Sequence, residues 1–184
     1  MCTSIDQLDI NTPDFTVYLK NIKESRELHG ILRRAKVLSY AYAIKHKNSI
    51  MKIGESSDKA TVYGSRLVRQ VGNMPGFDEH RKSGSGKEML SVVEDFEKLH
   101  GITVHKDDCS VMVWNVSGVK TTSFAERKIS LQAEDSLVTQ HEKINGCLPP
   151  GNYLDTRPRK LQGHVRYSDF DKLFDIIGTS QYNI

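Results

Sequence analysis

Residues 39 to 66 constrain the fold more than any other stretch of the chain. Two apolar runs, at 37–44 and 50–53, flank the polar sequence Lys-His-Lys-Asn-Ser. This pattern predicts a β-hairpin with a loop of about five residues. Gly54 is expected to end the second strand, and Arg66 begins a run with helical spacing. The sequence therefore predicts that tyrosine, lysine and arginine side chains, none of them a typical core residue, gather on two strands and a helix start.

The rest of the chain predicts helices around a small antiparallel sheet. Helical segments are expected after Thr12-Pro13-Asp14, at Val62 to Val71, at Lys87 to His100, from about Ser123 or Ala125 to Ile144, and from Ser168 to Gly178. The stretch 76–87 is rich in glycine and charge and is expected to be a loop. Cys109 to Val116 is apolar enough to be a third, central strand. The predicted fold class is α/β (α+β), a three-stranded antiparallel sheet flanked by helices, with helical extensions at both ends.

The composition excludes several classes of protein. A chain of 184 residues, 38% hydrophobic and 27% charged, is expected to form one globular core. No apolar stretch approaches the roughly 18 residues of a membrane span, and no signal peptide is expected. The three cysteines form neither a disulfide framework nor a zinc pattern, which favours a reducing, cytoplasmic setting. A net charge of +3 is compatible with a polyanionic partner without requiring one.

Two segments of the predicted hairpin and two segments far downstream follow one another in an order that can be compared with known families. They are Tyr40-Ala41-Tyr42, Lys52-Ile53-Gly54, Glu134 followed by Leu137 and Val138, and Leu148-Pro149-Pro150-Gly151-Asn152, with Arg66 on the helix between. With a step of ten residues from Tyr42 to Lys52, this order resembles the GIY-YIG nuclease family over roughly residues 37 to 153. Lysine stands where the family has its second tyrosine, as it does in some restriction endonucleases of that family.

The resemblance implies that the chain is divided into three parts. Residues 1–36 would be an N-terminal helical arm, and 37–153 the GIY-YIG-like nuclease domain. Residues 154–184 would be a basic segment followed by a C-terminal helix.

The catalytic residues that the resemblance implies are Tyr42, Lys52, Arg66, Glu134 and Asn152. Tyr42 would orient or deprotonate the attacking water, if a cation or the metal–phosphate cluster lowers its pKa. Lys52 would lower that pKa or bind the phosphate, and Arg66 would clamp a phosphate oxygen through its fork of donors. Asn152 would have a supporting role. The plainer alternatives are a half-buried strand tyrosine and a solvated strand lysine.

Glu134 is the expected metal ligand. Its carboxylate lies on the apolar side of its helix, and a buried carboxylate is usually paired or bound to a metal. The alternative is a salt bridge to an arginine or lysine. The resemblance implies Mg²⁺ or Mn²⁺, and one carboxylate plus a substrate phosphate suffices because Mg²⁺ keeps several waters.

Basic residues outside the catalytic set are candidates for contacts with the DNA backbone. They are Arg69, Arg81, Lys82, Lys87, Arg157, Arg159 and Lys160. Arg69 lies one turn after Arg66 and remains an alternative for the catalytic arginine. His80, His141 and Tyr63 are further candidates for supporting roles.

The expected function is a divalent-metal-dependent endonuclease that hydrolyses double-stranded DNA in a sequence-specific, restriction-like manner. The restriction type is favoured over a homing enzyme because no appended DNA-binding module is recognisable. A homodimer or higher oligomer would let one small domain act on each strand. A homing or phage-type enzyme of the same family is one alternative. A catalytically inactive DNA-binding protein is another, and an interaction domain with an accidental match is a third.

Overall fold

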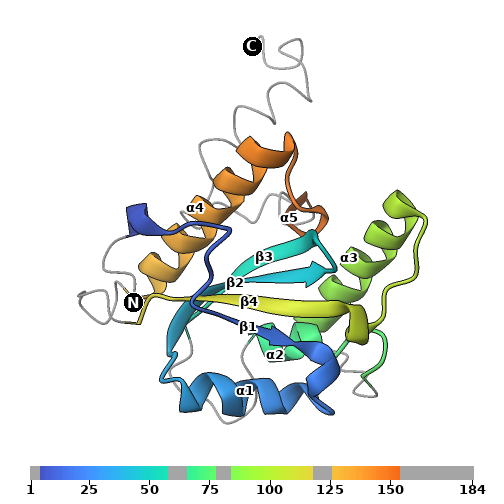
Figure 1. The fold of residues 1–184 in the computed structure, drawn as a ribbon, viewed down its shortest axis with the longest axis horizontal. Helices are drawn as coiled ribbons and strands as arrows, with labels where there is room; N and C mark the ends of the chain where they lie inside the picture. The colour runs from blue at the N-terminus through green and yellow to red at the C-terminus, as the bar shows by residue number, and fades with distance from the viewer. Residues whose placement is uncertain (1–4, 58–65, 78–83, 118–125, 154–184) are drawn as a thin grey trace, which may run out of the picture.

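The computed structural model describes residues 5–57, 66–77, 84–117 and 126–153. Four strands form one antiparallel sheet in the order β1-β4-β2-β3 (Figure 1). The strands are β1 (Phe15–Tyr18), β2 (Ser39–His46), β3 (Ser49–Ser57) and β4 (Cys109–Asn115). The α-helices of the described residues are α1 (Ser25–Arg34), α2 (Arg66–Val71), α3 (Gly84–His100), α4 (Glu126–Asn145) and α5 (Pro150–Tyr153). The predicted class, an antiparallel sheet with flanking helices, is confirmed.

The prediction of three strands is wrong, because the N-terminal stretch expected to be helical contributes β1. The backbone amide of Asp14 donates to the carbonyl of Val113 at 2.9 Å. Its carboxylate accepts from the amide of Asn115 at 2.7 Å. Asp14 therefore extends the ladder between β1 and β4 instead of capping a helix, and helix α1 begins only at Ser25. Short apolar runs suit either kind of element, and pairing with a distant strand decides this one.

The predicted hairpin of β2 and β3 is confirmed, with longer strands and a shorter turn. His46 pairs with Ser49, so the five-residue loop is reduced to a tight turn in which Lys47 has a φ of 50°. Strand β3 also continues through Gly54 to Ser57, so the prediction that Gly54 ends it is wrong. Both strands of the hairpin carry residues of the site described below, Tyr42 on β2 and Lys52 on β3.

The long helices α3 and α4 occur where periodicity predicts them. Helix α3 begins at Gly84, so the end of the expected 76–87 loop is helical instead. Gly101 and Gly146, with φ values of 63° and 70°, follow the two helices in the left-handed conformation typical of helix ends. The helix predicted from Ser168 lies outside the described residues. Within the described ranges, no helix combines the length and apolar character needed to cross a membrane.

The sheet is covered on both faces, and successive residues of β2 point to opposite layers. Tyr42 and Ile44 join a core formed with α1, α2 and α3. Ala41 and Ala43 join a second core formed with α4. Figure 1 shows α4 on one side of the sheet and α1 and α2 on the other. Although α2 and α4 lie on opposite faces of the sheet, both contact the edge strand β3.

Candidate active site

Tyr42 lies fully buried at the centre of the candidate site. Its hydroxyl donates to Oε1 of Gln70 on α2, at a distance of 2.5 Å. The residue opposite on β3 is Gly54, where a Cβ would lie 2.5 Å from the phenol oxygen and 2.6 Å from Cζ. The phenol therefore lies against the backbone of the edge strand, in space that only glycine leaves open.

Charges from both layers of the protein act on this phenol. Burial raises the pKa of Tyr42 well above its ordinary value of 10.0, the charge of Arg66 lowers it, and the carboxylates of Glu134 and Glu88 raise it. Arg66 belongs to α2 and Glu134 to α4, so the two helices bring opposite charges to one hydroxyl at the edge of the sheet. The lowered pKa that would make Tyr42 a base is not found, because burial outweighs the effect of Arg66.

Lys52 is buried in an ion-pair cluster. Its side chain is 0% exposed, and Nζ donates to Oε1 of Glu88 at 2.8 Å and to the carbonyl of Gly151 at 2.9 Å. Arg66 places Nη2 at 3.3 Å from the same Glu88 oxygen. One carboxylate thus joins cations from β3 and α2. The alternative of a solvated strand lysine does not hold, since Lys52 is buried with anionic and carbonyl partners.

Asn152 supports the edge strand through its side-chain amide. Oδ1 accepts from the backbone amide of Ile53 at 2.9 Å, and Nδ2 donates to the Ile53 carbonyl at 3.0 Å. Because β3 is the last strand of the sheet, these two backbone groups have no neighbouring strand to pair with. The Asn152 side chain thus takes the place of a neighbouring strand at Ile53, between Lys52 and Gly54, which pair with Ile44 and Tyr42 of β2.

We expect Asn152→Ala to lower the free energy of unfolding by about 2 kcal/mol, because it leaves two buried backbone groups of Ile53 without partners. For a chain of this size that corresponds to a fall in Tm of roughly 4–8 °C, measurable by thermal denaturation. Asn21→Ala, at an exposed position, is the matched control and should change stability by less than about 0.5 kcal/mol. Equal stability of the two variants would show that the Asn152 amide contributes nothing to β3.

Glu134 is 5% exposed on α4, and its charge, like that of Glu88, raises the pKa of Tyr42. Ser130, one turn earlier, donates to Glu55 of β3 at 2.8 Å, so a second buried carboxylate faces α4. Carboxylate oxygens suit Mg²⁺ and Mn²⁺. The described part of the chain holds no group of three or more histidine, cysteine, aspartate or glutamate side chains that could bind a metal. A divalent ion held by Glu134 therefore stays a prediction, in which waters and a substrate phosphate would supply the other ligands.

Two residues of this cluster, Gln70 and Glu88, were not predicted. Gln70 is buried, and its Nε2 has no hydrogen-bond partner in the described structure. Its spacing of four from Arg66 places both on one helix face, which is a signal that the sequence does contain. Glu88 offers no such signal, because its partners come from β3 and α2 and their approach depends on the tertiary fold.

The predicted DNA contacts are only partly within the described residues. Arg69 is half-buried on α2, and its Nε lacks a hydrogen-bond partner there. Arg66, in contrast, pairs with Glu88 and acts on the Tyr42 pKa, which favours it over Arg69 as the arginine of the cluster. Lys87 is exposed on α3. Outside the described residues lie Arg81, Lys82, Arg157, Arg159 and Lys160, together with His80 and Tyr63.

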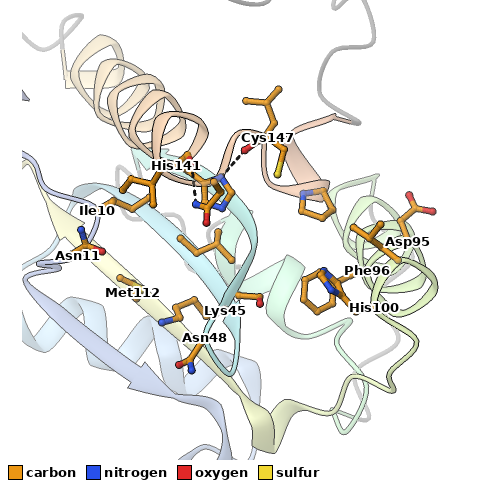
Figure 2. A pocket seen from close by; sticks show the side chains of 17 residues that line it. Ile10, Asn11, Lys45, Asn48, Asp95, Phe96, His100, Met112, His141 and Cys147 are labelled. Atoms are coloured by element: carbon orange, nitrogen blue, oxygen red, sulfur yellow. Dashed lines mark hydrogen bonds between the residues drawn. The ribbon is translucent and has the colours of Figure 1, made fainter.

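A groove of about 800 Å³ lies elsewhere, between the hairpin turn and the ends of α3 and α4 (Figure 2). Apolar and polar side chains line it, among them Phe96, Met112 and His141. His141 places Nδ1 at 3.0 Å from the carbonyl oxygen of Cys147. Burial lowers the pKa of His141. None of the predicted catalytic residues lines this groove.

Comparison of the chain with protein-family models, with curated proteins and with solved structures gave no match.

Proposed function

We propose that this protein is a divalent-metal-dependent endonuclease that hydrolyses phosphodiester bonds of double-stranded DNA, with a site of the GIY-YIG type. The observation that supports the proposal is the environment of Tyr42. A phenol, a guanidinium and a carboxylate from three distant parts of the chain interact at one edge of the sheet, where Gly54 leaves room for the phenol. Buried ionisable groups with strongly perturbed pKa values are typical of catalytic sites.

Tyr42 would position the attacking water. Its proton is directed to Gln70, so the lone pairs of the phenol oxygen can accept a hydrogen bond from water. With its pKa raised by burial, Tyr42 stays neutral at neutral pH. We therefore infer that it orients the water and does not deprotonate it.

Arg66 and Lys52 would neutralise the phosphate. A guanidinium can bind a non-bridging oxygen through parallel N–H donors, and this stabilises the charge that grows as water attacks phosphorus. Lys52 supplies a second positive charge from β3. A divalent ion held by Glu134 would add Lewis-acid stabilisation of the same charge.

The function is tested with plasmid DNA and Mg²⁺, with EDTA in a parallel reaction. Conversion of supercoiled plasmid to nicked or linear DNA only with Mg²⁺ supports the proposal. Binding without cleavage under the same conditions would favour a DNA-binding protein that does not cut. Absence of both binding and cleavage would favour an interaction domain with no role on DNA.

We expect Tyr42→Phe to lower the cleavage rate by about 10²-fold, because the ring is kept and only the hydroxyl that orients the water is lost. Single-turnover cleavage rates at saturating enzyme measure this effect apart from DNA binding. The control is Tyr18→Phe, which removes a hydroxyl from a side chain that is 56% exposed on β1 and should leave the rate unchanged. A Tyr42→Phe enzyme as fast as this control would remove Tyr42 from the mechanism.

A further inference from the structure

The carboxylate of Glu88 holds together the two cations that the proposed mechanism assigns to phosphate. Its Oε1 lies 2.8 Å from Lys52 Nζ and 3.3 Å from Arg66 Nη2. A single oxygen accepting from an ammonium and a guanidinium is the arrangement that a non-bridging phosphate oxygen would also adopt. Glu88 thus has the charge and the contacts of a bound anion.

The partners in this cluster differ in their access to water. Lys52 is 0% exposed, whereas the Glu88 side chain is 20% exposed and Arg66 is exposed to a similar degree. The next residue, Met89, is fully buried and fixes α3 against the core. Glu88 can therefore leave by turning its own side chain outward, without movement of the helix, but Lys52 cannot follow it into water.

We propose that Glu88 is an internal stand-in for the substrate phosphate, and that the site opens only when another anion displaces it. This inference rests on the proposed function, whose phosphate-binding position it identifies. When Glu88 turns out, Lys52 keeps the carbonyl of Gly151 but loses this carboxylate. Taking a carboxylate away from a buried ammonium is costly, so the exchange becomes favourable when a phosphate oxygen arrives in its place.

Two consequences follow for binding. Neutral ligands and water do not displace Glu88, because neither replaces the negative charge that is lost when its side chain turns outward. Competition with Glu88 also weakens every phosphate that binds, so the contacts of neighbouring phosphates along a nucleic-acid backbone would be needed to shift the exchange. Glu88 thereby favours a polyanion over an isolated phosphate.

The test uses Glu88→Gln, which keeps the shape of the side chain and removes its charge. Thermal denaturation of the full chain is followed with increasing inorganic phosphate, and with KCl at matched ionic strength. Glu88→Gln should have a lower Tm than wild type without phosphate, and phosphate should restore it. The dissociation constant of phosphate, taken from the concentration dependence of Tm, should fall by about tenfold relative to wild type.

Glu94→Gln is the matched control, because it makes the same charge change at an exposed position of α3. It should bind phosphate as wild type does. A Glu88→Gln variant that is destabilised but not rescued by phosphate beyond the effect of KCl would overturn the inference and leave Glu88 a structural counter-ion. If Glu88→Gln does not fold, Glu88→Asp, whose carboxylate is retracted by one methylene, takes its place. No gain in phosphate affinity by that variant would equally overturn the inference.

A second arm separates this inference from the proposed function. Binding of a short DNA duplex is measured in EDTA, where no cleavage occurs, and Glu88→Gln should bind about tenfold more tightly than wild type. If Glu88→Gln binds the duplex as tightly as wild type or more weakly, the proposed role of Glu88 is overturned. The DNA-binding site of the proposed function is then retained. Phosphate rescue without any duplex binding supports the exchange at Glu88 and overturns DNA as the substrate.

Discussion

Gly54→Ala is expected to lower the free energy of unfolding by about 3 kcal/mol, which corresponds to a fall in Tm of roughly 6–12 °C for a chain of this size. The added Cβ would lie 2.5 Å from the phenol oxygen of Tyr42 and 2.6 Å from Cζ. Neither atom can retreat easily, because the ring is fully buried and its hydroxyl is held by Gln70. Cleavage activity should fall with stability, since any shift of the ring moves the group that orients the water.

The matched control is Gly30→Ala in the interior of α1. A Cβ there meets Arg34 Nη1 at an ordinary distance of 3.5 Å. Replacing a helical glycine without a clash should raise stability by about 0.4–1 kcal/mol, so the two substitutions are expected to have opposite signs. In a Tyr42→Ala background, Gly54→Ala should become much less harmful, because the atoms it meets are gone. If Gly54→Ala is tolerated in the presence of Tyr42, the phenol does not lie over the edge strand.

Glu134→Gln is expected to lower Mg²⁺-dependent cleavage by at least about 10³-fold, because the amide is nearly isosteric but is a poor ligand for a hard cation. DNA binding in EDTA should be retained or strengthened, since one negative charge is removed near the phosphate. Single-turnover cleavage at several Mg²⁺ concentrations is the measurement, and thermal denaturation confirms that the variant is folded.

Glu94→Gln, which removes a carboxylate from the exposed face of α3, serves as the control for this charge change and should cleave at the wild-type rate. Calorimetric titration with Mn²⁺ adds a readout besides activity. The wild-type protein should bind the ion in the presence of uncleavable DNA, and Glu134→Gln should not. Cleavage by Glu134→Gln at the wild-type rate would mean that the metal is held by another residue.

Elements with strong local patterns were predictable from the sequence. The hairpin follows from two apolar runs around a polar turn, and α3 and α4 follow from helical periodicity ended by Gly101 and Gly146. Strand β1 was not predictable in this way, since four residues carry little pattern and their structure depends on pairing with β4. The hydrogen bonds of Asp14 to β4 are what turn a plausible helix start into a strand.

The candidate site was only partly predictable for a similar reason. The positions of Tyr42, Arg66 and Glu134 in the sequence were compatible with a shared site, but α2 and α4 cover opposite faces of the sheet. The charges of Arg66 and Glu134 act on the same phenol because β3 is an edge strand and Gly54 has no side chain where the phenol of Tyr42 lies. The direction of the Tyr42 pKa shift could not be inferred from residue types, because it depends on the depth of burial.

The amide of Asn152 also governs how this protein can associate with others. An exposed outer strand invites another polypeptide to add itself to the sheet, and proteins commonly block this by covering the strand. At Ile53 the outward amide and carbonyl are already bonded within the chain. Growth of the sheet by edge-to-edge assembly is therefore obstructed at Ile53, in the middle of β3.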